Sequence, residues 1–122
     1  MATLGLTINF ASLQLSGDYL VNPEMITFGS KTISIAGIHF IHDKLTLTTT
    51  DATLNKGNVG TIGFVYLRNL DLTNNALFGA DGTNYWLSLL PGECGLFRWN
   101  ATNIHGKSSA ATVPIEYFMV EN

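Results

Sequence analysis

The chain has 122 residues, the usual size of one domain. Apolar residues make up 46% of it and charged residues only 12%, about half the charged share of roughly 25% in ordinary soluble domains. The net charge is −3, and the six basic residues are scattered, so the sequence lacks the clustered positive charge that nucleic-acid binding requires. A surface this poor in charge resists association weakly, and we expect part of it to be covered by a partner.

The cellular compartment is constrained by three features of the sequence. Cys94 is the single cysteine, so no disulfide can form within the chain, which fits assembly in a bacterial cytoplasm. The first basic residue is Lys31, and we therefore expect no secretory signal with a positively charged start. No apolar run approaches the length of a membrane span, so we expect no membrane insertion.

Apolar and polar residues alternate with a period of two along most of the chain, which predicts strands. The first strand contains a change of parity near Ala11, which predicts a bulge or bend. Residues 55–60 and 71–84 read as loops, and Pro91-Gly92 reads as a type II turn. The predicted strands cover residues 4–15, 25–28, 33–40, 45–47, 61–70, 85–90, 96–99 and 112–121.

About eight short strands, with no repeat, no linker and no helical periodicity, predict one all-β domain over residues 1–122. We expect a single-domain antiparallel β-sandwich. A jelly roll is the favoured topology, and an immunoglobulin-like sandwich is the alternative.

Three predicted strands are apolar on both faces, although a strand of a two-layer sandwich has one buried and one wet face. We expect the outer faces to form an interface, with a homotrimer as the favoured assembly. The alternative is that loops such as residues 71–84 cover these faces within the monomer. The candidate interface residues from strand parity are Val65, Leu67, Trp86, Trp99 and Phe118.

Metal ligands are not placed together by the sequence. His39 and His42 are three residues apart, which puts them on opposite faces of a strand, and His105 falls in a predicted loop. Four residues of one loop could offer oxygen ligands to calcium, but their spacing matches no EF-hand, and such residues also favour turns. These four are Asp71, Asn74, Asn75 and Asp81. We expect turns and no metal site.

Catalytic motifs are also missing from the sequence. Gly106-Lys107-Ser108 ends like a phosphate-binding loop, but Ala101 stands where that motif needs a glycine. Cys94 has no motif that pairs it with a base. We therefore expect no enzyme and no cofactor. The tryptophans and tyrosines are interpreted as packing anchors. A lectin-like module that binds a host-surface glycan is the alternative of another class.

The C-terminal half resembles small β-sandwich structural proteins of tailed bacteriophages, either decoration (cement) proteins or tail-associated ones. The resemblance covers about residues 61–122 and implies a non-enzymatic virion protein. It favours a capsid decoration protein that binds itself and the major capsid protein, with a tail, connector or fibre protein as the alternative. The motifs that carry it are RNLD at residues 68–71, TN at 73–74, LPGE at 90–93, LFRW at 96–99 and VPIEY at 113–117.

Overall fold

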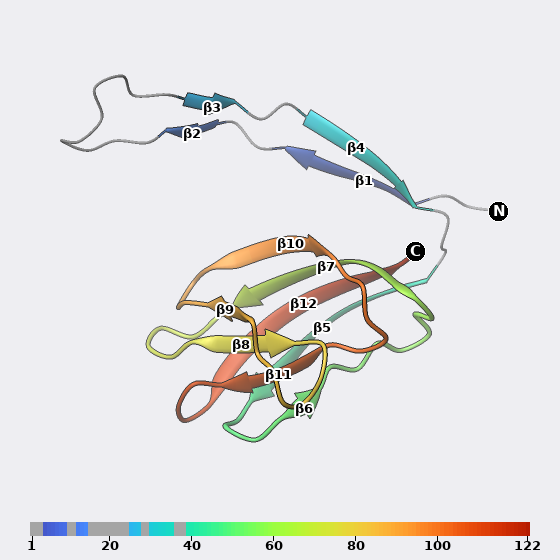
Figure 1. Cartoon of the computed structure of the whole chain (residues 1–122). Coiled ribbons are helices and arrows are strands. Elements are labelled where there is room, and N and C mark those ends of the chain that lie inside the picture. Colours follow the sequence, from blue (N-terminus) through green and yellow to red (C-terminus); the bar gives the residue numbers. More distant parts are fainter. Residues whose placement is uncertain (1–3, 10–11, 15–24, 28–29, 36–38) are drawn as a thin grey trace.

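A computed structural model shows how the chain folds (Figure 1). The structure describes residues 4–9, 12–14, 25–27, 30–35 and 39–122. All regular structure in these residues is β, and they contain no helix that is long and apolar enough to cross a membrane.

Two antiparallel sheets of four strands each form a β-sandwich, which confirms the predicted fold class (Figure 1). We name each sheet after a central strand. The β12 sheet has the order β10-β7-β12-β5 and consists of β5 (Phe40–Leu47), β7 (Ile62–Asn69), β10 (Cys94–Arg98) and β12 (Val113–Glu121). The β8 sheet has the order β6-β11-β8-β9 and consists of β6 (Ala52–Thr53), β8 (Ala76–Gly79), β9 (Leu87–Leu89) and β11 (His105–Ser108).

The N-terminal segment forms two further ladders, each of two antiparallel strands. β1 (Leu4–Asn9) pairs with β4 (Ser30–Ile35), and β2 (Ser12–Gln14) pairs with β3 (Met25–Thr27). Figure 1 draws them end to end beside the sandwich. The bend predicted near Ala11 lies outside the described residues.

The hydrophobic core lies between the two sheets. β12 contributes alternate residues to it, including Ile115, Tyr117 and Met119, and β8 contributes Phe78 from the facing sheet. Val65 and Leu67 of β7 belong to this core and are 0% exposed. They therefore do not lie on the outer face to which strand parity assigned them.

Three strands of the β8 sheet, β6, β8 and β11, were not predicted, because their sequences carry little apolar alternation. β8 lies inside the predicted loop 71–84, and β11 reads His-Gly-Lys-Ser, without one large apolar residue. Gly106 takes the core-facing position in β11. A Cβ atom there would lie 3.2 Å from Leu47 and 3.3 Å from Phe78, so the core passes close to the bare backbone.

The buried side chain of Asn69 joins the two sheets at one end of the sandwich. Asn69 ends β7, and its amide nitrogen donates to the carbonyls of Asn74 and Leu89, each at 2.9 Å, at the start of β8 and the end of β9. Its side-chain oxygen accepts a hydrogen bond from the Asp71 N–H at 2.8 Å. Both ends of this buried amide are therefore satisfied, as a polar group in a core requires.

The predicted turn at Pro91-Gly92 is present and is attached to the same corner. The Glu93 N–H donates to the Leu90 carbonyl at 3.0 Å, and Gly92 has a φ of 79°, as the third residue of a type II turn requires. The Gly92 N–H donates to the Asn69 carbonyl at 3.1 Å. The RNLD and LPGE motifs thus meet at one corner of the fold.

Replacing Asn69 tests how much this corner contributes to stability. We expect Asn69→Ala to lower the free energy of unfolding by about 3 kcal/mol, because two buried carbonyls and one N–H lose their partner. Urea unfolding measures the change. The exposed Asn100 is the matched control, and Asn100→Ala should change stability by less than about 0.5 kcal/mol. An equal loss in both variants would contradict the role of the corner.

Candidate functional site

An apolar patch lies on the outer face of the β12 sheet, opposite the core. The register places Val120 beside both Phe64 and Phe40, and Phe118 beside Tyr66. Phe64 and Val120 are buried in this second cluster, whereas Phe40 is 58% exposed. We call this set the outer patch, and it consists of Phe40, Phe64, Leu96, Phe118 and Val120.

Aromatic contacts hold the outer patch together. The rings of Phe40 and Phe118 lie 5.7 Å apart between centroids, and the guanidinium of Arg98 lies 4.6 Å from the centroid of Phe64. Arg98 also donates to the Asn122 side chain at 3.2 Å. An aromatic centre next to an arginine is typical of interface cores, where Phe and Arg are enriched.

Histidine–carboxylate pairs border the outer patch. His39 lies 2.8 Å from Glu121, and His42 lies 3.0 Å from Glu116. Glu121 also accepts a hydrogen bond from the Gly60 N–H at 3.0 Å, which ties the loop before β7 to β12. These pairs fix the ends of β5 and β12 where the patch lies.

The loop before β9 presents a second apolar surface, a single exposed tryptophan on a rigid support. Trp86 is 63% exposed and stacks on Trp99, with ring centroids 5.3 Å apart and planes 24° apart. Trp99 is 4% exposed, and its indole N–H donates to the Asn103 carbonyl at 3.1 Å. The buried ring thus supports the exposed one.

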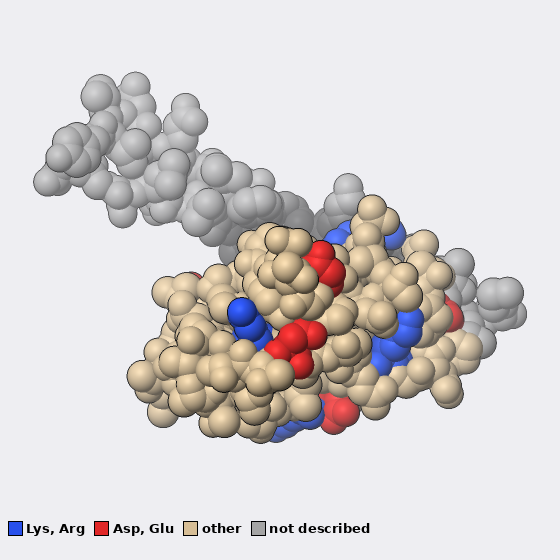
Figure 2. All heavy atoms as spheres, turned by 60° about the horizontal axis from the view of Figure 1, so that its bottom comes forward, with Lys and Arg blue, Asp and Glu red and all other residues tan. Residues whose placement is uncertain are grey.

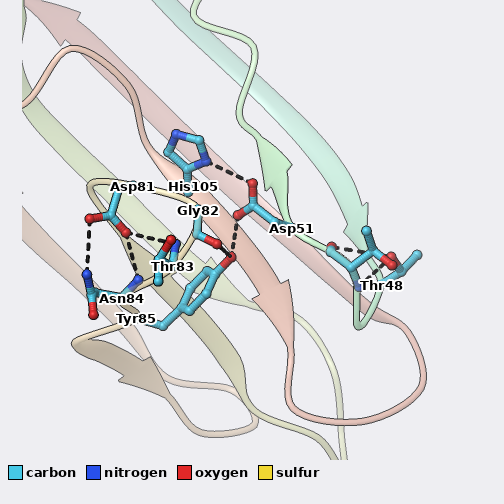
Figure 3. Close-up of polar contacts among 9 residues, drawn as sticks. Thr48, Asp51, Asp81, Gly82, Thr83, Asn84, Tyr85 and His105 are labelled. Carbon is cyan, nitrogen blue, oxygen red and sulfur yellow. Dashed lines mark hydrogen bonds and ion pairs between the residues drawn. The ribbon is translucent and has the colours of Figure 1, made fainter.

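A polar cluster beside Trp86 fixes the loop that carries it (Figure 3). Asp51 accepts a hydrogen bond from the Tyr85 hydroxyl at 2.5 Å and lies 2.9 Å from His105 Nδ1. Asp81 accepts from the N–H groups of Thr83 and Asn84 and forms the turn that leads to Tyr85. Because Tyr85 directly precedes Trp86, this cluster sets the position of the indole.

Electrostatics within the polar cluster favour a charged Asp51 and a neutral Tyr85. Burial would raise the pKa of Asp51, but hydrogen bonds from Tyr85 and His105 outweigh it, and the net pKa is lowered. Burial and the hydrogen bond to Asp51 raise the pKa of Tyr85 to about 12. The hydroxyl therefore keeps its proton and remains a donor at neutral pH.

A histidine beside an aspartate also occurs in acid–base catalysis, but two pockets of the described residues lie elsewhere. One pocket has a volume of about 250 Å³ and is lined by residues 60–62 and 99–102. Another is lined by residues 39–41 and 57–58. Neither reaches His105, whose ring holds the loop through Asp51.

The histidines and aspartates considered as metal ligands form hydrogen bonds within the protein. His39, His42 and His105 each pair with a different carboxylate. The carboxylates of Asp71 and Asp81 accept backbone hydrogen bonds within their own turns, which supports the turn interpretation. Residues 39–122 and the described strands before them hold no cluster of three His, Cys, Asp or Glu residues suited to a metal ion.

The structure separates the five predicted interface residues into three groups. Val65 and Leu67 lie in the core, and Trp99 is buried beneath Trp86. Trp86, in the loop before β9, is exposed, and Phe118 of β12 is half-buried in the outer patch, and their interface role stays a prediction.

Sequence reasoning missed Phe64 and Phe40 as outward residues. The sequence did contain a signal for the outward face of β7. Arg68 lies on the same face of the strand as Phe64, and it is exposed. A charged residue marks the wet face of a strand even where both faces are apolar.

The polar cluster predicts a pH-dependent behaviour of Tyr85. Because the pKa of Tyr85 is raised, the protonated Tyr85 hydroxyl stabilises the fold fully below about pH 10, the usual tyrosine pKa. This stabilisation is lost as the pH rises through about 12. We expect Asp51→Asn to move one tyrosine to a lower pKa, because the carboxylate charge disappears. Absorbance at 295 nm measures this titration. The control Asp71→Asn should leave the curve unchanged, and an unchanged curve for Asp51→Asn would contradict the cluster.

Charged side chains are few and stand apart on the face of the molecule shown in Figure 2. No protein-family model, curated protein or solved structure matches the chain.

Proposed function

We propose that this protein is a non-enzymatic structural protein that assembles with copies of itself through the outer patch. The observation that carries the proposal is the second apolar cluster on the outer face of the β12 sheet, with Phe40 more than half exposed at its edge. Phe40 is the exposed member of this cluster, and Leu96 and Phe118 are partly exposed beside the buried Phe64 and Val120. Apolar side chains gathered on an outer face are typical of an interaction site.

The mechanism is the burial of apolar area between neighbouring subunits. Complete burial of one Phe side chain contributes roughly 1.5–3 kcal/mol. The ring contacts that already order Phe40 and Phe118 reduce the entropy lost when a partner binds. The outer patch can therefore serve as an interface centre without a change of fold.

We further propose that the assembly is a tailed-phage virion, with the protein as a trimeric decoration protein that stabilises the head by binding the major capsid protein. The resemblance of residues 61–122 supports this location. Two of the motifs behind it, RNLD and LPGE, meet at the Asn69 corner, so they are folding devices, as a structural protein requires. A tail, connector or fibre position is the alternative. Imaging of purified parent particles would locate the copies, and their absence from particles would overturn the proposal.

Substitution of Phe40 tests the role of the outer patch. We expect Phe40→Ser to raise the dissociation constant of the self-assembled protein about tenfold, because burial of an exposed ring is lost on association. Sedimentation velocity over a range of concentrations measures it, and urea unfolding checks the fold.

The matched control for Phe40 is Leu72, a large apolar residue that is 92% exposed in the loop after β7. Leu72→Ser removes a similarly exposed apolar side chain away from the outer patch and should leave the dissociation constant unchanged. Equal effects of the two substitutions would mean that general hydrophobicity, rather than the outer patch, drives assembly.

Glycan binding is the second candidate function, and the exposure of Trp86 favours it. An indole held flat on a buried ring is suited to stacking against a sugar. A glycan array tests this candidate, with Trp86→Ala expected to abolish binding. The control is Leu90→Ala, which alters another exposed apolar residue close to Trp86 in the chain.

A further inference from the structure

A small pocket lies at one end of the β12 sheet, between the start of β7 and the end of β10. It has a volume of about 250 Å³ and is lined by residues 60–62 and 99–102. The two segments are neighbours because β10 and β7 pair in the sheet, and the Trp99 N–H donates to the Gly63 carbonyl at 3.0 Å. Ile62 and Trp99 are buried and supply the apolar part of the lining. We call this site the Trp99 pocket.

Hydrogen bonds from two charged side chains hold the backbone of the Trp99 pocket in place. The Lys56 ammonium donates to the Gly60 carbonyl at 3.2 Å and to the Thr102 carbonyl at 3.0 Å, so it joins the two sides of the pocket. Glu121 accepts a hydrogen bond from the Gly60 N–H at 3.0 Å. Neither charged residue belongs to the lining. The pocket is therefore preformed, as most ligand sites are, and its lining is uncharged.

The polar side chains of the Trp99 pocket have no partner in the described part of the chain. Thr61, Asn100 and Thr102 line the pocket and are exposed, and no hydrogen bond within the described residues involves their side chains. The Asn69 and Asn84 side chains, by contrast, are both used within the fold. Two hydroxyls and one amide of the pocket therefore remain available to donate to and accept from a ligand.

The chemistry of this lining selects a neutral, hydroxyl-rich ligand with one apolar face. A sugar ring has such a face, formed by its C–H groups, and a rim of hydroxyls that both donate and accept hydrogen bonds. An anionic ligand would find no cationic side chain in the lining. Pockets for drug-sized ligands measure roughly 300–1,000 Å³, so a volume of about 250 Å³ suits a single ring.

We propose that the Trp99 pocket binds the terminal sugar ring of a neutral glycan. This inference rests on glycan binding, the second candidate function, and adds a specificity pocket to the exposed ring of Trp86. Trp99 connects the two, because it lines the pocket and stacks on Trp86 with ring centroids 5.3 Å apart. The pocket then selects the terminal ring, and the next ring of the glycan stacks on Trp86.

NMR titration of the ¹⁵N-labelled chain tests the pocket. The probes are the methyl glycosides of glucose, galactose, mannose, N-acetylglucosamine and N-acetylgalactosamine, together with the terminal sugar of any glycan that binds on the array. The chain has two tryptophans, so substitution of Trp86 identifies the indole N–H signal of Trp99. We expect at least one probe to shift this signal and that of the Asn100 side-chain amide. The dissociation constant should be on the order of 1 mM, as for other ligands of about a dozen non-hydrogen atoms.

Substitutions in the pocket and a matched control identify the groups that bind the probe. Asn100→Ala and Thr61→Val should each raise its dissociation constant about tenfold or more, because each removes hydrogen bonds to the sugar. Thr112→Val is the control, since Thr112 is also exposed but lies outside the pocket, and it should leave binding unchanged. Urea unfolding verifies that each variant keeps the stability of the unsubstituted chain.

Two results would overturn the assignment of the pocket. One is probe binding that is as strong in Asn100→Ala and Thr61→Val as in Thr112→Val. The other is a chain that binds glycans on the array but none of their terminal sugars in solution. Either result leaves glycan binding through Trp86 standing. A chain that binds neither an arrayed glycan nor any probe would overturn glycan binding itself, together with the pocket.

Discussion

The hydrogen bonds of the Asn69 side chain are the contact on which the arrangement of the two sheets depends. Hydrophobic burial alone would allow one sheet to slide over the other, because apolar contacts have no direction. The Asn69 amide instead links the end of β7 to defined carbonyls at β8 and β9. A satisfied polar group in a core gives that core a specific register. The position of β9 in turn determines where the loop that carries Trp86 ends.

The two candidate surfaces on this sandwich share one feature. In each, polar contacts at the edge of an apolar group hold that group in place. Glu116 and Glu121 hold His42 and His39 beside the outer patch, and Asp51 holds Tyr85 beside Trp86. Ordering of these groups before a partner arrives lowers the entropy lost on binding. The outer patch lies on strands of the β12 sheet, whereas Trp86 lies in the loop before β9, so one surface can serve contacts between copies while the other remains available.

The sequence was sufficient to predict the β-sandwich and the turn at Pro91-Gly92, because alternation and turn chemistry are local signals. It was insufficient for β8 and β11, where core contact is made by small residues such as Gly106. Parity identified two apolar faces in β7 but not which one was buried, so Val65 and Leu67 were assigned outward. The Asp51 cluster could not be predicted, because its members are 34 and 54 residues apart and meet only after folding.

The pairing of every histidine with a carboxylate has a consequence for how distant parts of the chain are joined. The three imidazoles meet carboxylates that are 82, 74 and 54 residues away in the sequence. Each pair therefore forms only after the segments that carry its two members have come together, so it marks the completed fold rather than an early local structure.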